Sequence, residues 1–436
     1  MTIAHHRSIG FALWFAAGCV AGNPNFSSAG DAGSSDTPAE VDGSDPENPN
    51  NPGLNNPGNP NNPGAQAVPG PLAAFAMLPS SLPKAPTNHV ADDVNARALG
   101  RQLFFDTRLS EDATVACVSC HDPAHGLADD KALSVGVGGH LGARHALPIN
   151  DAVFHPFLFW DGRVDSAWAQ PLQAIENDKE MAFSRTEVAH FIAASYRAEY
   201  EQLFGALPAL DDLPVRAKPG LPAWDALTDE QKDVVQRIFA NVGKTLEAYE
   251  RQIICADTRF DRWVAGSVSF TNDEFQGART FVARGCVGCH AGPTFSDGQF
   301  HNIGLGSGTN QPDTGRSGAT AQLLADPFNG AGVYSDDRTA GQHKLDGVSQ
   351  ERGTLAAFRT PTLRGVGQRS FFGQRPAQHT LLDFITTVYH RPHLEPGAVG
   401  TLDPKLANVA GGGEPQLVAF LRTLDCPSLP ASLLAP

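Results

Sequence analysis

The chain has 436 residues, which is too long for a single hydrophobic core and suits two or three domains. Hydrophobic residues make up 41% of it, which is ordinary for a globular protein, and no apolar run is long enough to span a bilayer. The net charge of −15 argues against nucleic acid as a partner, because nucleic-acid-binding proteins present a basic surface.

Residues 1–19 have the pattern of a secretory signal segment. Arg7 precedes a short apolar run, and the segment ends in Ala16-Ala17-Gly18-Cys19. This ending resembles the lipobox of bacterial lipoproteins, in which the cysteine becomes the lipidated N-terminus. We therefore expect a protein of the periplasm or cell envelope, anchored by lipid at Cys19. Ordinary cleavage near the same position is the alternative.

Residues 20–88 are rich in Asn, Pro, Gly, Ser and Asp and contain almost nothing apolar. Such a composition cannot bury a core and predicts a disordered tether. Behind a lipid anchor, a flexible spacer of this length would let the folded part stand away from the membrane.

Two cysteine motifs of the same form indicate the cofactors. Residues 117–121 and 286–290 both read Cys-x-x-Cys-His, the attachment signature of c-type haem. The spacing lets two thiols reach the two vinyl groups of one porphyrin, while the histidine ligates the iron. Zinc is the alternative, but a zinc site usually pairs two nearby half-motifs, and these lie about 170 residues apart. We predict two covalently bound haem c groups, held by Cys117, Cys120, His121, Cys286, Cys289 and His290.

A helical stretch precedes each motif. Apolar spacing predicts one helix over 91–105 and another that starts from a capping box at Thr271. The repeated arrangement predicts a mainly α fold with two cytochrome c-like domains in tandem, residues 89–268 and 269–428. Residues 304–353 are polar and Gly-rich and predict a long loop insertion. Further helices are expected over 228–254, 383–389 and 415–424, with few strands.

Cys255 and Cys426 remain outside the two motifs. In an oxidising compartment such a pair can form a disulfide. The alternative is two buried thiols that never meet, because pairing requires their Cα atoms to be close.

Arranged in this way, residues 89–428 resemble the bacterial dihaem cytochrome c peroxidase / MauG superfamily. The matching segments, besides the haem motifs, are 103–110 (Leu-Phe-Phe-Asp-Thr-Arg-Leu-Ser), 159–163 (Phe-Trp-Asp-Gly-Arg), Glu180-Met181, 301–304 (His-Asn-Ile-Gly) and 359–364 (Arg-Thr-Pro-Thr-Leu-Arg). Their order and number make the resemblance specific. It implies that the N-terminal haem reacts with peroxide and that the C-terminal haem passes or stores electrons.

The resemblance also implies three catalytic residues: Glu180 and Gln170 in the peroxide pocket, and Trp160 as an electron relay between the haems. Chemistry supports Glu180 independently, because peroxide cleavage needs a proton removed from one oxygen and returned to the other, and a carboxylate can do both. An amide such as that of Gln170 can hold the peroxide. The structural alternatives are a solvated acid at Glu180 and a core tryptophan at Trp160.

The second haem departs from the peroxidase pattern in its sixth ligand. That ligand is commonly methionine, but this chain has only Met1, Met77 and Met181, in the signal, the tether and the peroxide pocket. MauG-like members use a tyrosine at the corresponding region. Tyr389 is therefore the first choice as iron ligand, ahead of His390 and then His379.

Two further features of the family are altered. In some members a loop histidine caps the peroxide haem until the enzyme is reduced; here Val137 stands at that point, with His140 and His145 nearby. If neither histidine reaches iron, the first haem is open at rest. The interdomain calcium ion of the family is in doubt, because His145 replaces its asparagine ligand, although Gln368 and Ser370 offer carbonyl groups.

Three functions are compatible with these features. The first is a cytochrome-c peroxidase that reduces hydrogen peroxide with electrons from a small carrier protein, a cytochrome c or a cupredoxin. The second is a MauG-like oxidase that uses peroxide to oxidise Trp or Tyr side chains of a partner protein; the missing methionine favours it. The third is a non-catalytic dihaem electron carrier, in which Glu180 and Gln170 would have no purpose. A homodimer is the default expectation for an oligomer.

Overall fold

The computed structural model describes residues 67–75, 78–306, 311–348, 354–376, 380–389, 392–408 and 411–436. Cys19 and residues 20–66 of the predicted tether lie outside the described residues, as do His379 and His390. Within the described ranges, no helix combines the length and the apolar character needed to cross a membrane.

Helices dominate the described secondary structure, as the sequence predicts. The α-helices are α1 (Gly70–Ala73), α2 (Val94–Phe105), α3 (Gln170–Glu176), α4 (Arg185–Ser195), α5 (Arg197–Phe204), α6 (Pro222–Asp225), α7 (Asp229–Glu250), α8 (Arg259–Val264), α9 (Asn272–Ala283), α10 (Arg316–Ala325), α11 (Arg338–Leu345), α12 (Leu381–Phe384) and α13 (Glu414–Arg422). A single π-helical turn, η9 (Ile385–Tyr389), continues α12. Two short strands, β1 (Phe300–His301) and β2 (Phe358–Arg359), pair antiparallel.

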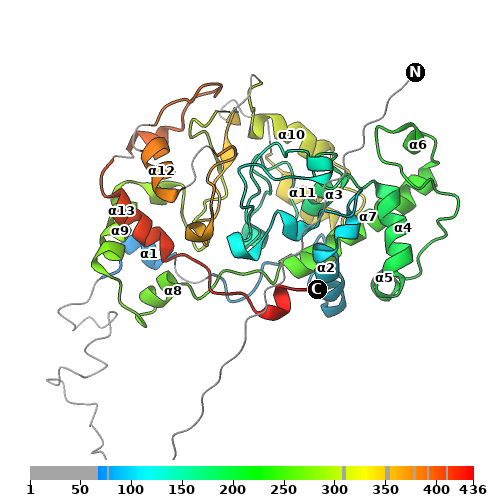
Figure 1. The fold of residues 1–436 in the computed structure, drawn as a ribbon, viewed down its shortest axis with the longest axis horizontal. Helices are drawn as coiled ribbons and strands as arrows, with labels where there is room; N and C mark the ends of the chain where they lie inside the picture. Colours follow the sequence, from blue (N-terminus) through cyan, green and yellow to red (C-terminus); the bar gives the residue numbers. More distant parts are fainter. Residues whose placement is uncertain are drawn as a thin grey trace, which may run out of the picture. The chain divides into compact units, whose positions relative to one another are not determined.

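One helix pair occurs twice (Figure 1). The helix before the first haem motif, α2, packs against α7, and the helix before the second motif, α9, packs against α13. Both crossings require a glycine. A Cβ on Gly100 would lie 1.9 Å from the carbonyl oxygen of Thr245, and one on Gly277 would lie 1.9 Å from that of Gln416. No side chain fits in such a contact, so glycine allows each helix to deliver its haem motif to a fixed place.

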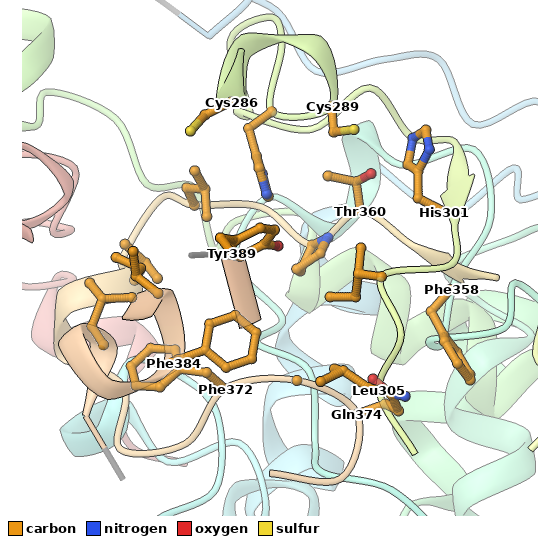
Figure 2. Close-up of a pocket in the computed structure, with 18 of the residues that line it drawn as sticks. Cys286, Cys289, His301, Leu305, Phe358, Thr360, Phe372, Gln374, Phe384 and Tyr389 are labelled. Carbon is orange, nitrogen blue, oxygen red and sulfur yellow. The ribbon is translucent and has the colours of Figure 1, made fainter. Parts of the chain in front are cut away.

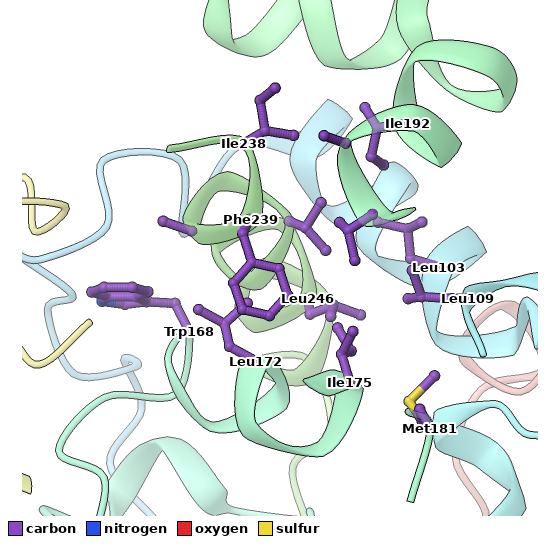
Figure 3. Packing of buried hydrophobic residues seen from close by; sticks show 14 of the residues in the cluster. Leu103, Leu109, Trp168, Leu172, Ile175, Met181, Ile192, Ile238, Phe239 and Leu246 are labelled. Atoms are coloured by element: carbon purple, nitrogen blue, oxygen red, sulfur yellow. The ribbon is translucent and has the colours of Figure 1, made fainter. Parts of the chain in front are cut away.

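The first hydrophobic core surrounds α7 (Figure 3). Phe239 and Leu246 of α7 are fully buried and face side chains from α2, α3 and α4, with Trp168 at one side. Burying a large apolar side chain stabilises a fold by about 1.5–3 kcal/mol. Cys117 packs at the edge of this core, which therefore positions the first haem motif.

The second core is smaller and rich in aromatic rings. It is built from α8, α9 and α13, with Phe281 and Phe420 fully or almost fully buried and the rings of Trp263 and Phe270 stacked at 4.0 Å. Cys286 packs against its edge, as Cys117 does against the first core. Each haem motif thus has a hydrophobic core of its own.

Part of the predicted tether belongs to the folded structure. Residues 67–75 and 78–88 are described, and α1 buries Leu72 completely in the second core, where Phe75 packs edge-on against Phe295 at 5.5 Å. The prediction of a tether extending to residue 88 is therefore too long at this end. The run Leu72-Ala73-Ala74-Phe75 is short and isolated, but it finds an apolar partner far away in the sequence.

The prediction of one long loop over 304–353 is wrong, because this insertion contains α10 and α11. It also leaves the second core and packs on the first: Phe328 and Tyr334 are buried there. Lys244 of α7 forms a 2.7 Å ion pair with Asp336. The insertion therefore fastens the C-terminal half of the chain to the N-terminal half.

The C-terminal residues return to the first half as well. The Tyr249 hydroxyl of α7 donates to the carbonyl oxygen of Leu433 at 2.6 Å, and Leu433 packs against the first core. Cys255 and Cys426 form a disulfide, with Cα atoms 5.0 Å apart. The open question of these two cysteines is thereby decided in favour of the bond.

Candidate functional site

The first haem motif forms a tight turn, η2 (Cys117–Ser119), that ends at its histidine. The His121 backbone N–H donates to the carbonyl oxygen of Cys117 at 3.0 Å. Its ring Nδ1–H donates to the carbonyl oxygen of Leu127 at 3.2 Å, which leaves Nε2 as the acceptor nitrogen. Burial lowers the pKa of His121 and keeps the imidazole in the neutral form that ligates metal.

The second motif repeats this geometry. The turn η6 (Cys286–Gly288) precedes His290, whose Nδ1–H donates to the carbonyl oxygen of Phe295 at 2.9 Å. Burial likewise lowers the pKa of His290. The four cysteines of the two motifs are free thiols.

The cavity beside the second motif fits a haem (Figure 2). Cys286 and Cys289 lie on one side of it, and its other walls include Phe372, Phe384 and Tyr389. A large, mostly apolar cavity with two free thiols and a neutral imidazole matches the vinyl groups, the apolar ring and the iron of one haem. These residues therefore fit the predicted cofactor.

Glu180 lies near the first motif. Burial raises the pKa of Cys120, and the Glu180 carboxylate is close enough to raise it further. Glu180 is partly buried, and this desolvation raises its pKa, while Arg163 and a hydrogen bond from Asn177 oppose the shift. The Asn177 Nδ2–H donates to Glu180 Oε1 at 2.7 Å. Glu180 is thus a held carboxyl group and not a freely solvated one.

The loop that contains Val137, where some family members have a capping histidine, fixes the backbone of Glu180. The Val137 N–H donates to the Glu180 carbonyl oxygen at 2.9 Å, and Val137 is buried. His140, three residues further, is exposed. Gln170 is the first residue of α3, and among the described residues no hydrogen bond joins it to Glu180. Its role in holding peroxide stays a prediction.

Tyr389 lies in the cavity of the second motif (Figure 2). It is the last residue of the π-helical turn η9, and its ring packs edge-on against Phe384 at 5.9 Å. Burial raises its pKa, and the nearby thiols of Cys286 and Cys289 raise it further. The structure therefore brings Tyr389 to the predicted haem, whereas the other two choices, His390 and His379, lie outside the described residues.

Trp160 and His145 stand in the wall of this same cavity. The indole N–H of Trp160 donates to the His145 carbonyl oxygen at 2.8 Å, and Trp160 is buried. The His145 Nδ1–H donates to the carbonyl oxygen of Lys131 at 2.9 Å. Both residues belong to the N-terminal half of the chain, so this half contributes to the second haem cavity.

One group of possible metal ligands occurs among the described residues: Cys289, Asp297 and His301, with ligand atoms within 4.8 Å of one another. Burial acts against a charge on His301, but hydrogen bonds to Asp297 and Asp403 raise its pKa to about 10. In the structure His301 Nε2 lies 2.9 Å from an Asp297 oxygen and Nδ1 lies 2.6 Å from an Asp403 oxygen, so the histidine is held in an ion-pair cluster. The family's interdomain calcium ion, which the sequence puts in doubt, is a separate question that these residues do not test.

The sequence did not indicate that Asn177 and Arg163 are neighbours of Glu180 in the predicted peroxide site. Arg163 packs over the Phe159 ring at 3.5 Å and donates to Gln173 Oε1 at 2.8 Å. Its position in the 159–163 segment was the available signal, because an arginine beside a catalytic carboxylate tunes its protonation. Asn177 carried no signal, since an asparagine in a polar turn ordinarily caps its own backbone.

Comparison with known proteins agrees with this geometry. A family model described as di-haem cytochrome c peroxidase matches residues 95–269. Cytochrome-c peroxidase IdrP2 of Denitromonas iodatirespirans is 30% identical over 349 residues, which cover 78% of this chain and 83% of that protein. Methylamine utilization protein MauG of Methylorubrum extorquens is 28% identical over 366 residues, 82% of this chain and 85% of that protein.

A solved structure shares the fold. The diheme peroxidase BthA from Burkholderia thailandensis superimposes with a TM-score of 0.58 at 21% identity, covering 76% of this chain and 86% of that one. With 30% identity over most of both sequences to a named cytochrome-c peroxidase, this chain belongs to the dihaem cytochrome c peroxidase / MauG family.

Proposed function

We propose that this protein is a dihaem c-type peroxidase that reduces hydrogen peroxide with electrons from a small redox protein of the periplasm or cell envelope. Its two haems are bound through thioethers at 117–121 and 286–290. The observation that carries the proposal is the partly buried carboxyl of Glu180, held at 2.7 Å by Asn177 and within electrostatic reach of Cys120. A carrier of electrons alone has no use for such a group.

Reducing peroxide to two waters consumes two electrons and two protons. When bound, the first haem, held by Cys117, Cys120 and His121, would supply an iron that activates peroxide, and the second haem, held by Cys286, Cys289 and His290, would supply electrons. Glu180 accepts the proton of the near oxygen and gives it to the far oxygen, which leaves as water. The Gln170 amide orients the peroxide, and Arg163 lowers the pKa of Glu180 so that the ionised form is available.

Trp160 completes the proposed route between the two haems. Its ring is buried in the wall of the second cavity, and its backbone carbonyl accepts from the Arg359 N–H at 2.7 Å. The indole N–H also donates to the His145 carbonyl oxygen at 2.8 Å, so the ring itself is held in place.

The test is a stopped-flow experiment on the purified two-haem protein. The fully oxidised protein is mixed with peroxide and then with a reduced small cytochrome c. Rapid oxidation of the donor over many turnovers is the expected result. A protein that binds both haems and does not react with peroxide would overturn the proposal.

Tyr389 supports a second candidate, the MauG-like oxidase that acts on Trp or Tyr side chains of a partner protein. The described lining of the second cavity contains this tyrosine and no methionine. An oxygen ligand stabilises oxidised iron and lowers its potential, which disfavours uptake of electrons from an ordinary cytochrome. In the same experiment, a long-lived oxidised form of the protein that does not react with the reduced donor would support this candidate.

A further inference from the structure

The cavity beside the second haem motif has an unbalanced charge. Its described lining includes Arg284, Arg359, Arg369 and Lys405 and no aspartate or glutamate. An apolar cavity with cations and no acid of its own is unfavourable unless its ligand brings negative charge, because a buried charge needs a partner.

Two of these cations are balanced by residues behind the cavity wall. Arg284 forms an ion pair with Glu414 at 3.3 Å. Lys405 lies 3.5 Å from a carboxylate oxygen of Asp297, and its side chain is 47% exposed. Solvent and these partners neutralise both charges.

Arg359 and Arg369 form no direct ion pair, although Asp425 and Asp151 act on Arg369 from a longer distance. No carboxylate lies within 4.0 Å of either guanidinium among the described residues. Arg359 is 4% exposed. It donates to the Phe159 carbonyl oxygen at 3.4 Å and to the Thr360 carbonyl oxygen at 3.5 Å, and both are long for hydrogen bonds. Its Nη2 donates to no described residue.

Arg369 also keeps an unused donor. Its two terminal nitrogens donate to the carbonyl oxygens of Thr362 and Arg364, but its Nε is buried and has no partner. The amide nitrogen of Gln374, a buried residue of the same cavity, has none either. Burial lowers the pKa of each guanidinium to about 10, which shows how much the surroundings oppose the charge.

We propose that Arg359 and Arg369 bind the propionate carboxylates of the haem attached at Cys286 and Cys289. The inference rests on the proposed function, since it requires that second haem. A c-type haem has an apolar ring, two vinyl groups consumed by the cysteines and two propionates. The two carboxylates match in number the two guanidiniums that lack a direct ion pair, and arginine binds carboxylates with well-directed donors.

The two arginines also lie where the halves of the chain meet. Arg359 holds the Trp160 carbonyl through its backbone N–H, and a Cβ on Gly126, in the loop after the first haem motif, would lie 3.3 Å from Arg369 Cγ. Propionates bound there would tie the second haem to two arginines that contact the N-terminal half. Arg359 and Arg369 are thus positioning residues for the second haem.

The experiment compares Arg359→Gln and Arg369→Gln with the matched control Lys405→Gln in the full-length holoprotein. All three remove one positive charge from the same cavity lining, but Lys405 is half-exposed and paired. The pyridine haemochrome assay first counts the haems. Spectroelectrochemistry then measures the midpoint potential of the second haem, and resonance Raman spectroscopy records its propionate bending modes.

The oxidised haem carries one more positive charge than the reduced haem. Removing a nearby positive charge therefore stabilises the oxidised form relative to the reduced form, and the midpoint potential falls. We expect an about tenfold shift of the oxidised-to-reduced ratio for either arginine, which is about 59 mV for a one-electron couple, and a smaller shift for the control. The propionate modes should move in the arginine variants alone. Unchanged modes and potential in both Gln variants would overturn the inference.

If a Gln variant fails to attach haem, the corresponding Arg→Lys variant is measured instead. It keeps the charge but not the directed donors, so the propionate modes should move while the potential stays near that of the parent. Unchanged modes would again overturn the inference. A parent protein that carries only one haem would refute the proposed function itself, which separates the two failures.

Discussion

The hydrogen bond from Asn177 to Glu180 gives the sharpest test of the peroxide site. Asn177→Asp keeps the oxygen that accepts from the Lys179 N–H at 3.0 Å, but it replaces the donor that lies 2.7 Å from Glu180 Oε1. A hydrogen bond to a charged group contributes about 1.5–3 kcal/mol. At about 1.36 kcal/mol per factor of ten, its loss lowers the acid dissociation constant of Glu180 about 10- to 150-fold. The carboxylate of the introduced aspartate also raises the pKa of Glu180, because it places a second negative charge beside it.

Activity should follow this change through pH. Glu180 must be ionised to accept the peroxide proton, so the rate constant for peroxide falls as pH falls through its pKa. Asn177→Asp raises that pKa and moves the acid limb of the profile to higher pH, with the rate at high pH retained. Stopped-flow measurement of the second-order rate constant against pH records both quantities.

Two further variants delimit the result. Glu180→Gln removes the titrating group, and the rate should fall about 10²- to 10⁴-fold with no acid limb. Asp178→Asn is the control, because this neighbouring acid is 74% exposed and pairs with Lys218. An acid limb that stays in place in Asn177→Asp, or a full rate in Glu180→Gln, would refute the acid–base role.

Three other results are expected. Tyr389→Phe should convert the second haem to a five-coordinate, high-spin spectrum, and an unchanged electron paramagnetic resonance signal would show that tyrosine is not its ligand. Cys255→Ser with Cys426→Ser opens a loop of 171 residues and should lower the free energy of unfolding by up to about 5 kcal/mol, measured with urea. The ion pairs of His301 raise its pKa from 6.5 to about 10, so their stabilisation is full below pH 6.5 and disappears as pH approaches about 10. Asp403→Asn should reduce this loss in melting curves recorded across that range.

Local signals were sufficient for the haem motifs and for the helices that carry them. The expected capping box is present, with the Thr271 N–H donating to Glu274 Oε2 at 2.7 Å and α9 beginning at the next residue. Thr228 caps α7 in the same way, and α7 ends at Glu250, close to the predicted end. Caps and apolar periodicity act within a few residues, which is why a sequence reveals them.

The insertion could not be predicted because its stability comes from elsewhere in the chain. Phe328 and Tyr334 are two aromatic residues in a polar, Gly-rich stretch, with no periodicity around them. Phe328 becomes a core residue because it packs against Trp168 and Phe239 of the first core, and Tyr334 packs against Phe328. The same holds for Leu72 in α1. When a segment is ordered only by its tertiary contacts, its composition does not reveal the helices that it forms.

The sequence indicates which residues could do the chemistry of the site, but it does not indicate the structural features that position them. The cysteine motifs and Glu180 carry their chemistry in their residue types. Tyr389, by contrast, reaches the cavity through a π-helical turn, which has no sequence signature and often occurs at functional sites. The unbalanced state of Arg359 follows from the absence of a nearby acid, and only the folded structure shows which residues are near.

Residues 159–163 connect Glu180 with the cavity beside the second haem motif. Arg163 lowers the pKa of Glu180 and packs over Phe159, whose neighbour Trp160 lies in the wall of the second cavity. In the proposed mechanism, five consecutive residues would therefore join proton transfer at the first haem to electron supply from the second. Such a connection favours a reaction that consumes both together, as peroxide reduction does, and it is of no use to a protein that only carries electrons.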